Sequence, residues 1–188
     1  MSYSLKVQIL HFVACGGQVT QTTILSEDDV FHFDVSLLVP ELQSQDRLGA
    51  IKELVDRLYG RRKVVDSLKF LQTILDREDQ MSTVLGRGVA LPHARCRSVA
   101  QPGVALGISQ TGIAFPPDAE PVHVICMVAV PDAAPVPYLS VLSNLALLFK
   151  NSDVRAGLMA CDTSMSMYQF MTKHLAQIRK MSAPHSVL

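Results

Sequence analysis

The chain has 188 residues, of which 48% are hydrophobic, and its 17 lysines and arginines balance its 17 aspartates and glutamates. This length fits one ordinary domain, or one domain with an extension, and the apolar content is ample for a packed core. The absence of net charge argues against a nucleic-acid binder, because such proteins carry a basic field. The four cysteines are scattered without a CxxC pair, which favours a reduced, cytoplasmic compartment. No apolar run approaches the roughly 20 residues that span a bilayer, so we expect no membrane insertion.

The N-terminal part of the chain is rich in β-branched and apolar residues. Residues 30–35 alternate as a half-buried strand would. The short apolar run at residues 9–15 is interrupted by His11 and predicts a buried strand rather than a secretion signal. We expect residues 1–28 to form an N-terminal extension or an added strand, and the domain core to begin at residue 29.

Two amphipathic helices are predicted next. Ser44 is the expected N-cap of the first helix, and Gly60 ends it. The second helix runs from residue 65 to about residue 77. Each carries an apolar stripe at i, i+3 and i+4 spacing, made of Leu48, Ile51, Leu54, Val55 and Leu58 on the first and of Leu68, Leu71, Ile74 and Leu75 on the second.

Two near-continuous apolar runs, residues 104–108 and 122–130, predict buried strands. Because continuous rather than alternating apolarity means that both faces are covered, these runs indicate a layered α/β fold. Helices are predicted at residues 138–150 and 153–159, and a last helix starts from a cap at Asp162 or Thr163. Residues 181–188 are expected to be a flexible tail.

The candidate site is the stretch between the second helix and the first buried strand, where residues 78–94 read EDQMSTVLGRGVALPHA. Pro92 fixes its own φ and holds Leu91 extended, so His93 is presented at a stiff strand edge. Gly86 and Gly88 let another backbone or an anion come close. Because imidazole is partly neutral, and so nucleophilic, near pH 7, His93 is a candidate histidine nucleophile.

This stretch closely resembles the phosphohistidine signature of the EIIA domains of the bacterial sugar phosphotransferase system, mannitol/fructose class, which nitrogen-regulatory (PtsN-like) EIIA proteins share. The signature is an acidic residue, a six-residue gap, Leu-Gly, two variable positions and Val-Ala-Leu-Pro-His-Ala. The similarity extends over roughly residues 29–178. It implies an α/β sandwich, with a small mixed β-sheet flanked by helices on both faces, and an EIIA type-2-like phosphocarrier domain at residues 29–180.

The resemblance also implies a chemistry. His93 would accept a phosphoryl group from an HPr-type carrier protein, and Arg77 would neutralise that group with its guanidinium fork. Many members carry a second histidine at the start of the helix where this chain has Tyr138. Tyrosine donates a hydrogen bond but is neither a cation nor a base near neutral pH, so we expect reduced activity.

Further phosphoryl-binding groups are weaker candidates. Ser82 and Thr83 would donate from their hydroxyls, and Gly86 and Gly88 would supply backbone amides. No metal or cofactor is expected, because no metal-ligand spacing, P-loop or Ser-His-Asp constellation is visible.

Three functions stay open from the sequence. The first is a phosphocarrier, regulatory rather than sugar-transporting because no EIIB-like or membrane segment accompanies it, with an EIIB domain or a regulated transporter or sensor protein as further partner. The second is a non-catalytic EIIA-like binding module, motivated by Tyr138 and the N-terminal extension. The third, a nucleotide-using kinase, is disfavoured by the missing phosphate loop.

Three other histidines and one cysteine have structural and functional interpretations. His32, His123 and His174 are predicted to be structural. Cys96, flanked by Arg95 and Arg97, is either a reactive thiol or an incidental exposed cysteine, and we favour the second interpretation.

Overall fold

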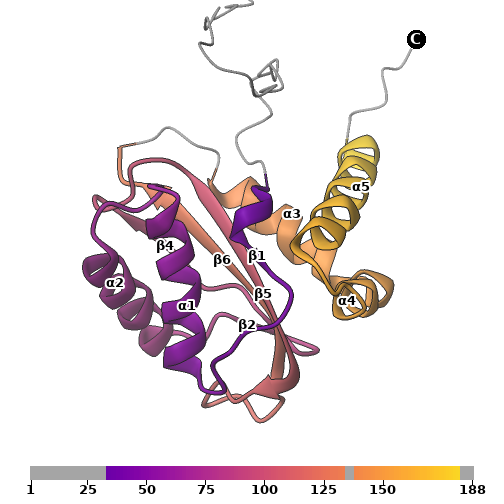
Figure 1. Cartoon of the computed structure of the whole chain (residues 1–188), viewed down its shortest axis with the longest axis horizontal. Helices are drawn as coiled ribbons and strands as arrows, with labels where there is room; N and C mark the ends of the chain where they lie inside the picture. Colours follow the sequence, from indigo (N-terminus) through magenta and orange to yellow (C-terminus); the bar gives the residue numbers. More distant parts are fainter. Residues whose placement is uncertain (1–32, 134–137, 183–188) are drawn as a thin grey trace, which may run out of the picture. The chain divides into compact units, whose positions relative to one another are not determined.

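The computed structural model describes residues 33–133 and 138–182, which form one mixed β-sheet between two layers of helices (Figure 1). Helices α1 (Arg47–Gly60) and α2 (Ser67–Gln80) cover one face. Helices α3 (Tyr138–Lys150), α4 (Ser152–Met159) and α5 (Ser164–Ser182) cover the other. This arrangement confirms the predicted α/β sandwich. The expected extension at residues 1–28 lies outside the described residues. Of the tail expected at residues 181–188, residues 181 and 182 belong to α5, and the others lie outside the described residues.

The sheet has six strands in the order β1-β5-β6-β3-β2, and β4 also pairs with β6. β1 is parallel to β5, β5 is antiparallel to β6, β3 and β4 are parallel to β6, and β2 is antiparallel to β3. Their bounds, with that of the short 3₁₀ helix η1, are η1 Val35–Leu37, β1 Leu38–Val39, β2 Val84–Gly86, β3 Val89–Ala90, β4 His93–Cys96, β5 Gly103–Ile113 and β6 Val122–Pro131.

β3 and β4 are two parts of one line along β6, interrupted at Pro92. Val89 of β3 pairs with Val124, and His93 of β4 pairs with Val128. Proline has no N–H to donate to a ladder, but the Pro92 carbonyl accepts a hydrogen bond from the Val128 amide at 2.9 Å. The chain is therefore held against β6 through the interruption, and His93 becomes the first residue of a new strand.

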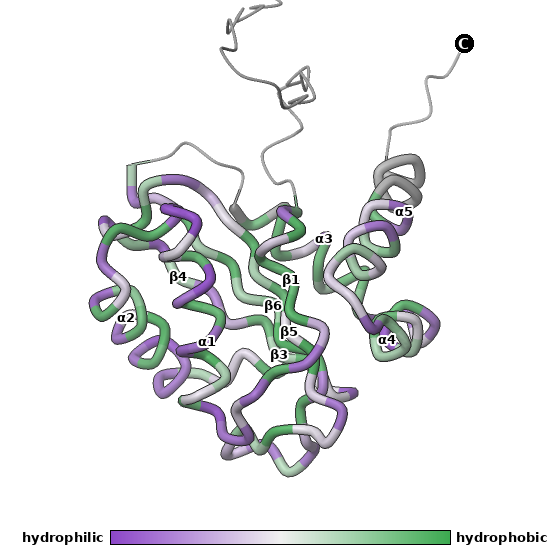
Figure 2. The backbone as a smooth tube through the Cα atoms, in the orientation of Figure 1, coloured by the Kyte–Doolittle hydropathy of each residue, from purple (hydrophilic) through white to green (hydrophobic). Residues whose placement is uncertain are grey.

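Strand β6 separates two hydrophobic cores. Ile125 and Met127 pack in the core under α1 and α2, whereas Cys126 and Val128 pack in the core under α3, α4 and α5. Figure 2 shows the consequence along the chain, with apolar central strands and helices that are mixed in hydropathy. The continuous apolarity of these runs predicted strands that are covered on both faces. The two cores confirm this prediction.

The N-caps of two helices test the local predictions. Asp46, and not Ser44, caps α1, with the Asp46 carboxylate accepting a hydrogen bond from the Gly49 amide at 2.9 Å. The Ser44 prediction was wrong because a better cap lies directly before the first helical residue. For α5 the prediction is confirmed at Thr163, whose hydroxyl accepts from the Ser166 amide at 3.1 Å.

The predicted strand over residues 30–35 is wrong in its described part. The Asp34 carboxylate accepts hydrogen bonds from the Ser36 amide at 2.9 Å and from the Ser36 hydroxyl at 2.6 Å. A side chain that caps its own neighbours in this way competes with strand pairing, so the chain turns into η1 before β1 begins. Residues 30–32 lie outside the described residues.

The predicted apolar stripes of α1 and α2 hold except in the first turns. Ile51 and Ile74, for example, are fully buried, whereas Leu48 and Leu68 are 52% and 75% exposed. Each exposed leucine is the second residue of its helix and belongs to neither core. The stripe therefore predicts the buried face only where the helix lies over the sheet.

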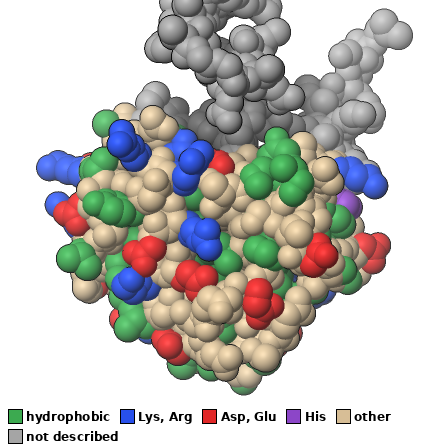
Figure 3. Space-filling view, in the orientation of Figure 1, with side chains coloured by type: hydrophobic (Ala, Val, Ile, Leu, Met, Phe, Trp, Pro, Cys, Tyr) green, Lys and Arg blue, Asp and Glu red, His purple; other side chains and the backbone are tan. Residues whose placement is uncertain are grey.

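The surface mixes both signs of charge. Acidic and basic side chains both occur over the face seen in Figure 3, as the balanced composition predicts. None of the helices in the described ranges is long and apolar enough to cross a membrane.

Candidate active site

His93 lies in an open pocket of about 290 Å³ where the end of α2, the loop that follows it and helix α3 meet. The pocket contains four of the residues that the sequence analysis singled out, namely His93, Arg77, Ser82 and Thr83. Its complete lining is Arg77, Ser82, Thr83, Val84, Leu85, Leu91, His93, Leu142, Ser143 and Ala146.

The local backbone determines which nitrogen of His93 carries the proton. The ring is half-buried, and its Nδ1 lies 2.7 Å from the carbonyl oxygen of Leu91. A carbonyl oxygen only accepts, so Nδ1 is the protonated nitrogen and donates this bond. In the neutral ring the lone pair is then on Nε2, which makes Nε2 the nucleophilic atom.

The surroundings keep this imidazole neutral. Burial lowers the pKa of His93 below its ordinary value of 6.5, because the charged ring would lose solvation. The hydrogen bond to Leu91 acts in the opposite direction, the positive charge of Arg77 lowers the pKa further, and the negative charge of Glu78 raises it. The net result is a lowered pKa, so most of the ring is in the nucleophilic form at neutral pH.

Arg77 is in the last turn of α2, where the sequence placed it, and is half-buried. One of its terminal N–H groups donates to the carbonyl oxygen of Met81 at 2.9 Å. A guanidinium has five N–H donors in a rigid plane, so this single bond anchors the side chain and leaves donors for an anion in the pocket. Burial is the main cause of the lowered pKa of His93, and the positive charge of Arg77 adds to it.

Both hydroxyls predicted to bind a phosphoryl group lie in the pocket but already donate within the protein. The Ser82 hydroxyl donates to the carboxylate of Asp118 at 2.6 Å, and the Thr83 hydroxyl donates to the buried carboxylate of Glu78. Since a hydroxyl has one proton, either residue would have to break its present bond to donate to a ligand. Their role as phosphoryl donors stays a prediction.

Gly86 and Gly88 are not among the residues that line the pocket. They lie at the turn between β2 and β3, where Gly86, Arg87 and Gly88 have φ values of 78°, 56° and 73°. The Arg87 amide between them donates to the carboxylate of Glu120 at 2.7 Å. The glycines therefore have a conformational reason to be present, and amide binding of a phosphoryl group by them stays a prediction.

An added methyl group should lower the free energy of unfolding by different amounts at the two glycines. An alanine Cβ at Gly88 would lie 3.2 Å from Cδ2 of His123, whereas one at Gly86 would meet nothing within 4 Å. We expect Gly86→Ala to lower the free energy of unfolding by about 1 kcal/mol, from backbone strain alone. Gly88→Ala should lower it by about 2–3 kcal/mol, because the close contact adds to the strain.

Urea unfolding of the two variants, with Gly60→Ala as control, measures this difference. Gly60 has no atom within 4 Å of an added Cβ and no positive φ. Equal stability of the Gly86 and Gly88 variants would contradict the role assigned to the close contact.

Tyr138 is the first residue of α3, but its side chain lies outside the described part of the structure. Helix α3 nevertheless contributes to the pocket through Leu142, Ser143 and Ala146, which the sequence analysis missed. These three residues follow the histidine by about fifty positions and carry no chemical signature. Only the packing of α3 against the sheet brings them there.

Glu78 is a further residue whose contact with the site the sequence does not reveal. It is the acidic residue that opens the signature stretch. In the structure its side chain is only 3% exposed and accepts two hydrogen bonds from Thr83.

Cys96 differs from its prediction, since it is buried and not exposed. It is the last residue of β4 and faces the core under α2, with its sulfur 3.0 Å from the Ser98 hydroxyl. Burial raises the pKa of the Cys96 thiol, but hydrogen bonds from Ser98 and Thr73 and the nearby charge of Lys69 outweigh it, and the net pKa is lowered. Arg95 is exposed on the other face of β4, and Arg97, which follows the strand, is exposed as well.

Two of the three histidines predicted to be structural lie in the described residues. Nδ1 of His123 is 3.0 Å from the carbonyl oxygen of Ser109, and Nδ1 of His174 is 2.8 Å from that of Phe170. Neither lines the pocket. His32 lies outside the described residues. Within the described ranges, no group of three or more histidine, cysteine or acidic side chains could hold a metal ion.

Solved structures with the same fold identify the class of domain. The chain is similar to the nitrogen regulatory protein IIA-Ntr from Neisseria meningitidis, with a TM-score of 0.68 and 28% identity over 74% of this chain and 95% of that chain. It is similar in fold to IIA mannitol from Escherichia coli, with a TM-score of 0.64 and 18% identity over 77% of this chain and 99% of that chain. The fold is that of an EIIA domain.

Sequence relatives identify the family. Residues 31–174 match the family described as phosphoenolpyruvate-dependent sugar phosphotransferase system, EIIA 2, and the chain belongs to that family. The chain is 31% identical over 88 residues to the fructose-specific EIIABC component of Bacillus subtilis, a stretch that covers 46% of this chain and 14% of that protein. It is 31% identical over 87 residues to the fructose-specific EIIA component of Haloferax volcanii, covering 46% of this chain and 56% of that protein. The match thus spans less than two thirds of either relative. The family match confirms the resemblance found from residues 78–94.

Proposed function

We propose that this protein is a histidine phosphocarrier in which Nε2 of His93 accepts a phosphoryl group from an HPr-type carrier protein. The observation that carries the proposal is the state of His93. Its Nδ1 is tied to the Leu91 carbonyl, its pKa is lowered, and it shares a pocket with Arg77. Membership of the EIIA family supplies the reaction class, which is phosphoryl transfer between proteins.

The proposed step needs little beyond alignment and charge. The Nε2 lone pair forms the new N–P bond as the N–P bond of the donor breaks and its electron pair returns to the donor imidazole. Arg77 neutralises the transferring oxygens, which is where charge stabilisation lowers the barrier most. The Leu91 carbonyl holds the ring orientation and stabilises the positive charge that develops on it.

Exposed apolar side chains around the pocket support a protein as the phosphoryl donor. Leu85, which lines the pocket, is 46% exposed, and Leu139 of α3 is 75% exposed. Apolar residues beside a reactive group suit a surface that another protein covers transiently.

A regulatory role is the second half of the proposal. Its support is the similarity to IIA-Ntr of N. meningitidis, which covers 95% of that chain at 28% identity. The fructose-specific relatives match over only 46% of this chain. In this proposal the phosphorylation state of His93 is a signal to a regulated transporter or sensor protein, and onward transfer to an EIIB domain is not the main outcome.

Tyr138 fits the proposal as a substitute for a second histidine. It precedes Leu142 by four residues, so the backbone of α3 puts it one helical turn before a residue that lines the pocket. A tyrosine there would supply a hydrogen-bond donor and no positive charge, which predicts slower transfer than in a domain with two histidines.

The test is incubation of the whole chain with phosphoenolpyruvate, Enzyme I and an HPr-type carrier, followed by intact mass. One acid-labile phosphoryl group per chain is expected. Failure of every such carrier to label the protein would favour the alternative, a non-catalytic EIIA-like binding module. Rapid passage of the label to an added fructose-class EIIB domain would overturn the regulatory half of the proposal.

The lowered pKa of His93 predicts the pH dependence of labelling. Only the neutral ring attacks, so the rate should fall as the pH drops and the ring is protonated. Because the folded pKa is below 6.5, the half-maximal rate should also lie below pH 6.5. The measurement uses an excess of phosphorylated carrier prepared beforehand, so that the supply of donor does not vary with pH. A midpoint above 6.5 would contradict the assignment.

A further inference from the structure

Glu78 is the one buried side chain among the aspartates, glutamates, lysines and arginines in the described ranges. A buried carboxylate is costly unless hydrogen bonds replace the water it loses. Glu78 meets this condition through one residue only. Its two oxygens accept from the Thr83 amide at 3.0 Å and from the Thr83 hydroxyl at 2.5 Å.

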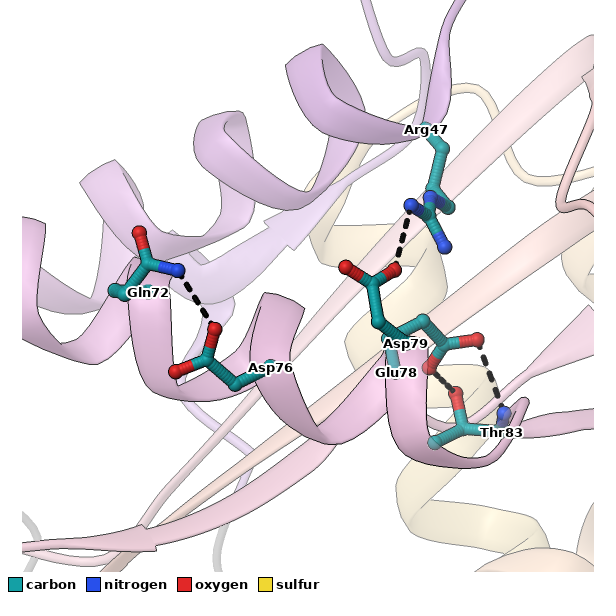
Figure 4. Close-up of polar contacts among 6 residues, drawn as sticks. All are labelled: Arg47, Gln72, Asp76, Glu78, Asp79 and Thr83. Atoms are coloured by element: carbon teal, nitrogen blue, oxygen red, sulfur yellow. Dashed lines mark hydrogen bonds and ion pairs between the residues drawn. The ribbon is translucent and has the colours of Figure 1, made fainter.

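Figure 4 shows how the end of α2 directs its two consecutive acidic residues apart. Asp79 points to Arg47 on α1, in an exposed ion pair of 3.0 Å. Glu78 points to Thr83, in the loop that leads into β2 and lines the pocket. The sequence places two similar carboxylates side by side, but only one of them contacts the site.

Hydrogen bonds continue from Thr83 to the reactive ring. The Thr83 carbonyl accepts from the Leu91 amide at 3.0 Å, and the Leu91 carbonyl accepts from Nδ1 of His93 at 2.7 Å. Glu78, Thr83, Leu91 and His93 therefore form one connected path. The middle step joins two backbone groups, and the last joins a backbone carbonyl to the ring.

The same loop is held at two further points. Arg77 donates to the Met81 carbonyl at 2.9 Å, and the Ser82 hydroxyl donates to Asp118 at 2.6 Å. Both of these contacts are at exposed positions, whereas the Glu78 contacts are buried. Since a buried charged hydrogen bond is the stronger kind, the Glu78–Thr83 pair is the main anchor of the loop.

We propose that Glu78 is a positioning residue of the phosphoryl site, which fixes the Thr83–Leu91 contact and thereby holds His93 in the tautomer with the proton on Nδ1. This inference rests on the proposed function of His93 as the phosphoryl acceptor. Glu78 itself touches neither the donor nor the phosphoryl group in this scheme. Glu78 instead determines which ring nitrogen carries the lone pair and the direction in which that lone pair points.

The experiment compares Glu78→Ala and Glu78→Gln in the whole chain, with Asp79→Asn as matched control. Two quantities are measured, the His93 tautomer from the ¹⁵N chemical shifts of its ring and the rate of phosphorylation by an HPr-type carrier. Glutamine can still accept from the Thr83 amide and can donate to the Thr83 hydroxyl oxygen, so it keeps the anchor without the charge. Alanine removes the anchor.

We expect Glu78→Ala to convert a single Nδ1-protonated tautomer into a mixture and to slow phosphorylation about 10- to 100-fold, as displacement of a reacting atom does. Glu78→Gln should keep the tautomer and remain within about threefold of the wild-type rate, because its hydrogen bonds persist. Asp79→Asn should match the wild type in both quantities.

Two results would overturn the proposal. One is an unchanged tautomer and rate in Glu78→Ala, and the other is an equal loss in Glu78→Gln and Glu78→Ala. If Glu78→Ala does not fold, Thr83→Val removes only the hydroxyl contact and must shift the tautomer in the same direction, and no shift there counts against the proposal.

The tautomer measurement needs no phosphorylation. It therefore decides the role of Glu78 even if the wild-type chain accepts no phosphoryl group, an outcome that would instead count against the proposed function.

Discussion

His93→Asn should abolish phosphorylation of this protein while leaving its fold intact. The asparagine amide can still donate an N–H to the Leu91 carbonyl, which accepts from Nδ1 of His93 at 2.7 Å in the wild type. It has no ring nitrogen in the place of Nε2. Since the attacking lone pair is removed and the local contact is kept, a complete loss of label would be chemical and not structural.

Intact mass after incubation with phosphoenolpyruvate, Enzyme I and an HPr-type carrier measures this loss, and circular dichroism checks the fold. His174→Ala is the control, because His174 is on α5 and stacks on Phe170 with ring centroids 4.2 Å apart, outside the pocket. It should be labelled like the wild type. Label retained in His93→Asn and lost in His174→Ala would move the acceptor site to the other histidine.

Much of the fold was predictable because burial leaves a direct trace in the sequence. Residues 122–130 are apolar without alternation, and the structure explains this by two cores, with Ile125 facing one and Cys126 the other. The helices α1 and α2 were predictable from their stripes for the same reason. These patterns record which faces of an element meet other elements, and they are independent of the details of the contacts.

Local side-chain competition explains where the prediction failed. The alternation at residues 30–35 is real, but Asp34 bonds to Ser36 and turns the chain into η1. Ser44 and Asp46 are both good N-caps, and only the position of the first helical residue decides between them. Cys96 looked exposed between two arginines, yet the alternation of β4 puts it on the inner face.

The motif residues of the candidate site could be predicted from the sequence, whereas the other residues that line its pocket could not. His93 and Arg77 are close in sequence and were predicted from the motif and the family resemblance, and the structure puts both in one pocket. Leu142 and Ser143 belong to α3, about fifty residues further along the chain, and only the tertiary packing of that helix brings them to the pocket. Glu78 was visible as an acidic residue, but its burial and its bonds to Thr83 depend on the end of α2 meeting the loop.

Replacing Arg77 with alanine should slow phosphorylation of His93 by about 100-fold or more, the usual loss when a charge-stabilising donor is removed from a transfer site. Arg77→Lys should recover only part of this loss, because an ammonium cannot reproduce the planar fork that suits phosphoryl oxygens. A second effect acts on the ring. Because the charge of Arg77 lowers the pKa of His93, the alanine variant should need a higher pH to reach its half-maximal rate.

Arg57→Ala is the matched control for this prediction. Arg57 and Arg77 are each the basic residue in the last turn of a 14-residue helix, so both substitutions remove the same favourable charge from a helix C-terminus. Arg57 is exposed on α1 and does not line the pocket. Single-turnover labelling over a range of pH should therefore separate the two variants, with Arg57→Ala at the wild-type rate. Equal rates for both would show that Arg77 serves the helix and not the phosphoryl group, and the charge stabilisation would then have to come from another residue.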